Sequence, residues 1–190
     1  MIRSMLVLIA VLLAACASDP AKRQEVARSE SARMRAPEVP LDAFSHFELA
    51  PMGMSPDVAK DERKVAVTEE VGRKLEARLA PRLAPLLAQW NASAPTGGSK
   101  RTLVIKPSIA SMHVVSTAAR FWIGALSGDS TIDLDLTLVE KETGALIANQ
   151  RINRSSNAMA GAWSVGASDR NLADYIVDIA HEYLASHHAK

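Results

Sequence analysis

Few side chains in this sequence combine the type and the spacing that catalysis or metal binding requires. The histidines do not form an HExxH pair or another compact ligand set; they are His46, His113, His181, His187 and His188. Asp133 and Asp135 lie two residues apart in an alternating pattern, so we expect a charged strand face and not an acid–base pair. GxSxG, P-loop and GxGxxG motifs are absent. We therefore predict a protein that is not an enzyme and has no metal or cofactor.

Two loops carry the side chains best suited to recognition. The first, residues 116–130, contains Arg120, Phe121 and Trp122, and the second, residues 155–168, contains Trp163. In each loop the Trp is followed closely by Gly-Ala. Because Trp and Arg are enriched at binding hot spots, these four residues form our candidate interaction patch.

A structural role for the same residues is the alternative. Both Trp rings could plug the open end of a sheet–helix core, since large aromatic side chains are mostly buried. Arg120 could pair with Asp129 or Asp169 instead of facing a partner.

A three-strand meander is the element that would bring the two loops together. Residues 131–140 alternate cleanly, which predicts a strand whose buried side carries Ile132, Leu134, Leu136 and Leu138. Apolar runs at about 102–115 and 145–154 flank it, the first with Pro107 as the sign of an edge or bulged strand. In a meander the chain leaves the first and third strands at the same end of the sheet, so both loops should lie there.

Helical patterns supply the second layer. Residues 57–90 repeat apolar positions at spacings of three and four from Val67 to Trp90, and Pro81 and Pro85 predict a kink or break near Ala80. A last helix begins at Ser168 or Asp169 and buries Leu172, Ile176, Ile179 and Tyr183. With a first strand at 43–50, we predict an α+β two-layer sandwich with a mainly antiparallel sheet, as one domain over residues 41–190.

The N-terminus reads as an export signal. Arg3 precedes an apolar run that ends in Leu13-Ala14-Ala15-Cys16, which is too short to span a bilayer. This quartet resembles the lipobox of bacterial lipoproteins. The resemblance implies a signal peptide over 1–15, cleavage between Ala15 and Cys16, and acylation of Cys16, the only cysteine. It further implies the periplasmic face of the outer membrane, because neither Ala17 nor Ser18 is the Asp that favours inner-membrane retention in such lipoproteins. An ordinary signal peptide with an incidental cysteine is the alternative.

The segment after Cys16 is polar. Residues 17–40 mix charges without a sustained apolar period, so we expect a flexible tether over 16–40 with a transient helix at 25–33. At full extension its reach is at most about 80 Å. The whole chain has 22 Lys and Arg against 21 Asp and Glu, and this balance argues against a nucleic-acid partner.

The loops also carry a resemblance to a family. ARFWIGALSGDS, the Thr143-Gly144 turn, NAMAGAWSVGASD and the final helix resemble a group of uncharacterised bacterial envelope lipoproteins, a domain of unknown function, over about residues 41–186. This implies an envelope role and assigns no catalytic residue. The architecture also resembles small periplasmic lipoprotein domains that regulate cell-wall synthases or assemble secretion pores.

Two functions fit these observations. The first is a lipid-anchored interaction or assembly module that binds an envelope protein or itself. The second is a carrier of a small apolar ligand or lipid, which an apolar pocket between sheet and helices would favour. An envelope hydrolase is disfavoured because no nucleophile–base pair is evident.

Overall fold

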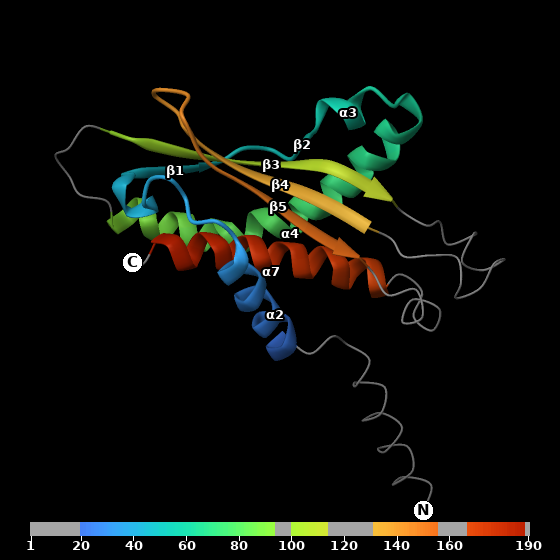
Figure 1. Cartoon of the computed structure of the whole chain (residues 1–190), viewed down its shortest axis with the longest axis horizontal. Helices are drawn as coiled ribbons and strands as arrows, with labels where there is room; N and C mark the ends of the chain where they lie inside the picture. The colour runs from blue at the N-terminus through green and yellow to red at the C-terminus, as the bar shows by residue number, and fades with distance from the viewer. Residues whose placement is uncertain (1–19, 94–99, 114–130, 156–166, 189–190) are drawn as a thin grey trace, which may run out of the picture.

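A computed structural model describes residues 20–93, 100–113, 131–155 and 167–188. Its elements, in chain order, are α2 (Pro20–Arg33), the short 3-10 helix η1 (Leu41–Ala43), β1 (His46–Leu49), β2 (Gly53–Met54), α3 (Pro56–Ala59), α4 (Glu62–Ser93), β3 (Thr102–His113), β4 (Thr131–Glu140), β5 (Leu146–Ser155) and α7 (Ala167–His188). The strands form one mixed sheet in the order β1-β3-β4-β5, with β2 also paired to β3. The long helices α4 and α7 cover one side of it (Figure 1). The predicted α+β two-layer sandwich with a mainly antiparallel sheet is confirmed.

The alternation of β4 decides which face of the sheet is buried. Its four predicted core residues are at most 5% exposed: Ile132, Leu134, Leu136 and Leu138. They belong to one core with Leu75, Leu79 and Leu83 of α4 and with the predicted buried side of α7, from Leu172 to Tyr183. Burying a large aliphatic side chain contributes about 1.5–3 kcal/mol, so this layer contact is the main stabilising feature of the fold.

The meander is present in the predicted order. β3 pairs with β4 and β4 with β5, both antiparallel, and the register aligns His113 with Thr131 and Thr131 with Ser155. The β4–β5 turn lies at the opposite end, where Gly144 has a φ of 72°. Glycine reaches this left-handed region without the steric cost that a Cβ would add.

The start of the sheet differs from the sequence expectation. β1 pairs with β3 in parallel, with α4 as the crossover between them, and the short β2 continues that pairing. β3 is therefore a central strand and not an edge strand, so of the two predicted alternatives the bulged strand is the one the structure supports. Pro107 is tolerated because the β1 pairing ends at Ile105 and the β2 pairing begins at Ser108, so its missing N–H faces a gap in the ladder. A register shift follows between Ile109 and Ser111.

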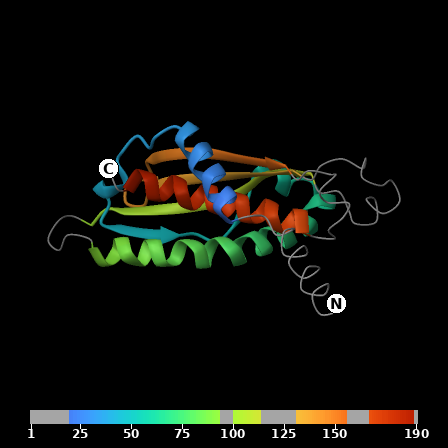
Figure 2. The same cartoon turned by 90° about the horizontal axis from the view of Figure 1, so that it is seen from below.

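The break predicted in the long helix does not occur. α4 runs as one helix of 32 residues through Pro81 and Pro85 (Figure 2). Both prolines are on the exposed side, while Leu79, Leu83 and Leu87 between and around them are buried. Packing of that face against the sheet offsets the hydrogen bonds that the prolines remove.

The prediction of a flexible tether over 16–40 is wrong from Pro20 onward. α2 packs against α7: Arg23 Nε lies 3.1 Å from Asp178 Oδ2, Gln24 donates to Glu182 at 2.8 Å, and the Ser31 and Ser186 hydroxyls are 3.2 Å apart. Ala27 is fully buried and Ser31 is 2% exposed. These two small residues, four apart on one helix face, form the buried contact of α2, which a pattern of large apolar residues does not reveal.

The chain between α2 and η1 is also fixed to the domain. The Gln150 amide and the Tyr183 hydroxyl both donate to the Arg35 carbonyl, at 3.0 and 3.1 Å. The Glu38 amide donates to the Ile147 carbonyl at 2.9 Å, beside the outer edge of β5. The folded unit therefore begins at Pro20 and not at Leu41, and residues 16–19 lie outside the described part.

Candidate interaction surfaces

The residues proposed from the sequence lie outside the described part of the chain. This applies to the anchor residues Ala15 and Cys16 and to the patch of Arg120, Phe121, Trp122 and Trp163. The structure does describe the ends to which the two loops attach. His113, Thr131 and Ser155 lie side by side at one end of the sheet, so both loops leave from that end as the meander requires.

The sheet face opposite α4 and α7 is not covered by either long helix (Figure 1). Cross-strand register arranges its residues in rows. Three rows are polar: Lys106–Thr137–Asn149, Ser108–Asp135–Arg151 and Ser111–Asp133–Asn153. The fourth row, nearest the β4–β5 turn, is Val104–Val139–Leu146, and Leu146 is 55% exposed. We call these four rows the open sheet face.

Side chains on the open sheet face bind one another across the strands. Arg151 contacts Asp135 through Nε at 2.7 Å and Nη2 at 2.9 Å, a bidentate pair. Ser111 donates to Asp133 at 2.6 Å, and Asn153 donates to the same carboxylate. The hydrogen bonds that Arg151 donates to Asp135 raise the pKa of its guanidinium above its usual range. The pairs keep these side chains extended over the sheet as a flat polar surface, next to one apolar row.

A charged groove lies on the opposite side of the molecule, where α2, α4 and α7 meet. Its cavity has a volume of about 440 Å³ and is lined by Pro20, Arg23 and Gln24 of α2, Ala77, Arg78, Pro81 and Arg82 of α4, and Asp174, Val177 and Asp178 of α7. We call it the three-helix groove. Figure 2 shows α2 lying across the helical layer there.

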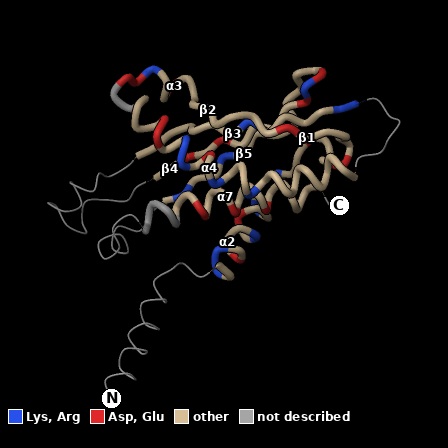
Figure 3. The backbone as a smooth tube through the Cα atoms, turned by 180° about the vertical axis from the view of Figure 1, so that it is seen from behind, with Lys and Arg blue, Asp and Glu red and all other residues tan. Residues whose placement is uncertain are grey.

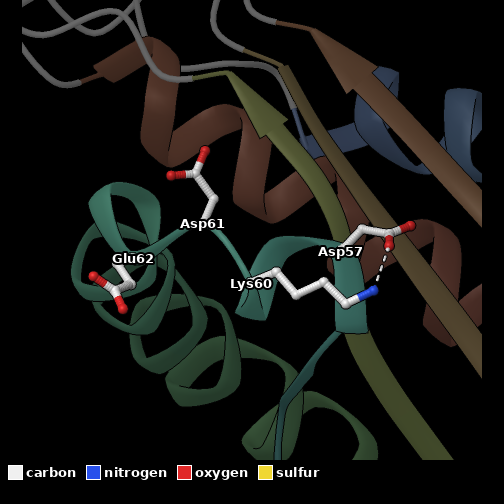
Figure 4. Close-up of a pocket in the computed structure, with 4 residues that line it drawn as sticks. All are labelled: Asp57, Lys60, Asp61 and Glu62. Atoms are coloured by element: carbon white, nitrogen blue, oxygen red, sulfur yellow. Dashed lines mark ion pairs between the residues drawn. The ribbon is translucent and has the colours of Figure 1, made fainter.

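A second hollow lies beside α3, at the start of α4 (Figure 4). Asp57, Lys60, Asp61 and Glu62 line it, and Lys60 Nζ is 3.7 Å from Asp57 Oδ1. Both partners of that ion pair are largely exposed, so solvent screens the contact. Within residues 20–93, 100–113, 131–155 and 167–188, no group of three or more His, Cys, Asp or Glu is arranged to hold a metal ion.

The described histidines have packing roles. The His188 ring stacks on Trp90 with centroids 4.0 Å apart, and burial lowers its pKa against the opposing effect of Asp42. Burial and the charge of Arg82 lower the pKa of His181. His46 lies on β1, 3.7 Å from Glu48. His187 Nδ1 lies 3.2 Å from the Ser186 hydroxyl and 2.7 Å from the Tyr183 carbonyl oxygen. Because a carbonyl oxygen only accepts, Nδ1 carries the proton and is not a base toward that serine.

Charges of both signs are intermixed along the described elements (Figure 3). α2 carries four basic and two acidic residues, and the opposite sign dominates α7. No described helix is long and apolar enough to cross a membrane.

Comparison with known proteins shows remote likenesses of structure only. No family model matches the chain, and no curated protein sequence matches it. Among solved structures, the PelC dodecamer from Paraburkholderia phytofirmans aligns with 12% identity and a TM-score of 0.46, over 79% of this chain and 94% of that one. A candidate lipoprotein from Caulobacter crescentus CB15 aligns with 13% identity and a TM-score of 0.36, over 84% and 93%. The hypothetical protein CT253 from Chlamydia trachomatis aligns with 11% identity and a TM-score of 0.33, over 74% and 98%. Likeness at this level supports no inference about function or assembly.

Proposed function

We propose that this chain is a lipid-anchored, non-enzymatic interaction module of the cell envelope, tied through Cys16 to the periplasmic face of the outer membrane. The observation that carries the proposal is the position of α2. It begins four residues after Cys16 and packs on the helical side of the domain, which supports an anchor on the side opposite the open sheet face.

The short connection determines how the domain is presented. Four residues at full extension span at most about 14 Å, far less than the reach of a free tether over the whole of 16–40. A domain joined this closely lies at the membrane surface with α2 toward it. The open sheet face is then directed into the periplasm.

The composition of the open sheet face suits a protein partner. Val104, Val139 and Leu146 give it one apolar row, and the three polar rows give it hydrogen-bonding groups beside that row. An apolar patch next to polar contacts is the usual anatomy of a transient protein interface. The partner is a second envelope protein or a second copy of the chain, and the Trp loops at the far end of the sheet are candidates to extend the contact.

Photo-crosslinking in intact cells tests this proposal. A photoreactive amino acid at Leu146, on the open sheet face, is expected to give a discrete protein adduct. The same residue at Ala84, an exposed position of α4, serves as the matched control and should not give that adduct. In the Cys16→Ser variant the chain should leave the membrane fraction and the Leu146 adduct should be lost. Membrane association that survives Cys16→Ser would disprove the anchor, and equal adducts at both positions would disprove the interface.

The carrier alternative is not favoured by any cavity described above. Charged residues make up the lining of the hollow beside α3 and half of the lining of the three-helix groove. A cavity of about 210 Å³ next to α3 combines Val58, Ala110 and Met112 with Asp57, Asp61 and Ser111. An apolar ligand is held best in an enclosed apolar pocket. The space between sheet and helices is instead filled by the buried core side chains.

A further inference from the structure

The sheet ends in β1 on one side and in β5 on the other, and contacts within the domain cover parts of both edges. On β1, the Asn91 side chain of α4 binds both outward backbone groups of Phe47. Asn91 Oδ1 accepts from the Phe47 N–H at 2.8 Å, and Asn91 Nδ2 donates to the Phe47 carbonyl at 3.1 Å. On β5, the Glu38 N–H donates to the Ile147 carbonyl at 2.9 Å. Such contacts keep an edge from pairing with a strand of another chain.

Residues 151–155, the second half of β5, have no comparable cover. They pair with β4 on one side, and in the part of the chain that the structure describes no backbone segment is hydrogen-bonded to their other side. Alternate N–H and C=O groups of a strand with one neighbour face outward, so this stretch offers a row of unpaired backbone groups. We call it the open β5 edge. Figure 2 shows β5 as the outermost strand of the sheet.

A second copy of the same strand fits the open β5 edge. In an antiparallel pairing centred on Asn153, the residues opposite one another are Asn153 and its copy, Arg151 and Ser155, and Ile152 and Arg154. Like charges directly opposite one another destabilise a strand pair, and this register places none there. The edge is therefore complementary to itself.

Asn153 suits the centre of this pairing. Its side-chain amide donates to Asp133, which leaves the amide oxygen and a second N–H without a partner in the described part of the chain. Since an amide both donates and accepts, two copies of Asn153 can bind one another. Arg154 Nη1 lies 3.6 Å from Glu30 of α2, and its guanidinium lies over the Tyr175 ring. The Arg154 charge is therefore neutralised within its own copy.

The symmetry of such a pair agrees with the proposed anchor. A two-fold axis that relates antiparallel edges of one continuous sheet is perpendicular to that sheet, so both helical layers lie on the same side. Two copies anchored through Cys16 in one leaflet can then pair without either copy turning over. Confinement to the leaflet raises their effective concentration, which suits a contact of five residues on each side.

We propose that the open β5 edge pairs with the same edge of a second copy, in the antiparallel register centred on Asn153. The pairing joins two open sheet faces into one continuous surface. The strand contact depends on residues 151–155 alone, whereas the shared leaflet rests on the anchored orientation proposed above.

Disulfide crosslinking of the full chain in intact cells, with copper phenanthroline as the oxidant, tests the register. Asn153→Cys should give a band of twice the chain mass on a non-reducing gel, because the Cβ atoms of residues directly opposite lie about 4.5–5.5 Å apart. Asn149→Cys is the matched control, since Asn149 is exposed on the same face of β5. Its two copies would be about 26 Å apart in this register and should not crosslink.

Hydrogen exchange of the unmodified lipidated chain in phosphatidylcholine vesicles gives a second test that needs no variant to fold. The amides of residues 151–155 should exchange more slowly as the number of copies per vesicle rises, while those of β1 should not change. In Asn153→Lys two ammonium groups would face one another, so the dependence on copy number should be lost. Asn149→Lys should keep it.

No dimer from Asn153→Cys, equal dimer from both cysteine positions, or an adduct with a protein of another mass would overturn the pairing. Exchange of residues 151–155 that is independent of copy number would do the same. Mass spectrometry of the vesicle sample reports whether Cys16 is acylated. A dimer formed by a chain with unmodified Cys16 would support the pairing and refute the anchor, so the two failures are distinguished.

Discussion

Ionisation of Tyr183 should destabilise the domain at high pH. Its side chain is fully buried, and its hydroxyl donates to the Arg35 carbonyl in the segment that joins α2 to η1. Burial raises the pKa of the phenol from 10.0 to about 12, against a smaller opposing effect of Gln150. Because the raised pKa belongs to the folded state, this stabilising contribution is complete below pH 10 and is lost as the pH rises toward 12. Two pKa units correspond to about 2.7 kcal/mol.

The chain has two tyrosines, Tyr175 and Tyr183, so replacing Tyr175 leaves Tyr183 as the one phenol that titrates. In a Tyr175→Phe background, the phenolate absorbance of the folded protein should titrate with a midpoint near 12. Urea unfolding between pH 9 and 12 then gives the free energy of unfolding. The matched variant Tyr183→Phe cannot ionise, and it should cost about 1 kcal/mol at neutral pH for the lost hydrogen bond.

Above pH 10 the free energy of unfolding should fall more steeply in the protein that retains Tyr183 than in the Tyr183→Phe variant. A phenol midpoint near 10 in the folded protein would show that the side chain is in solvent, which would refute the docking of the Arg35 segment. Parallel pH dependences in the two chains would assign the alkaline loss of stability to other groups.

The remaining predictions concern the core, one turn and α2. Leu136→Ala should lower the free energy of unfolding by about 2–5 kcal/mol in urea, because Leu136 is fully buried between the layers; a loss below about 1 kcal/mol would contradict that packing. Gly144→Ala should cost about 1–2 kcal/mol, because its φ is 72°; an unchanged urea midpoint would argue against this turn geometry. Trace trypsin should cut at Arg28 no faster than it cuts the folded domain, and rapid release of α2 would show that the helix is not docked.

The layer architecture was predictable because the large apolar residues follow clear periods. The alternation from Ile132 to Leu138 identifies the buried face of β4, and the spacing from Leu172 to Tyr183 identifies the buried side of α7. The parallel β1–β3 pair was harder to predict. β1 has four residues and β2 two, which is too short for a pattern to distinguish pairing direction.

The packed α2 could not be predicted from apolar periodicity because Ala27 and Ser31 are small. Its docking depends on contacts to α7 across more than 150 residues of sequence, such as Arg23 with Asp178. The same applies to the three-helix groove, whose arginines and aspartates come from three helices. A spacing rule along one segment cannot identify such a site. The predicted Trp patch stays a prediction, since Trp122 and Trp163 lie outside the described residues.

The orientation of the domain on the membrane is the central claim, and energy transfer from the domain to the bilayer measures it most directly. A fluorescent donor is attached to the lipidated chain either at Ala77, in the three-helix groove, or at Asn149, on the open sheet face. The fluorescent acceptors lie in the membrane plane. One helical layer separates these surfaces, so Asn149 should lie about 10 Å farther from the acceptors than Ala77. Equal distances for the two labels, or a shorter distance for Asn149, would contradict an anchor that begins four residues before α2.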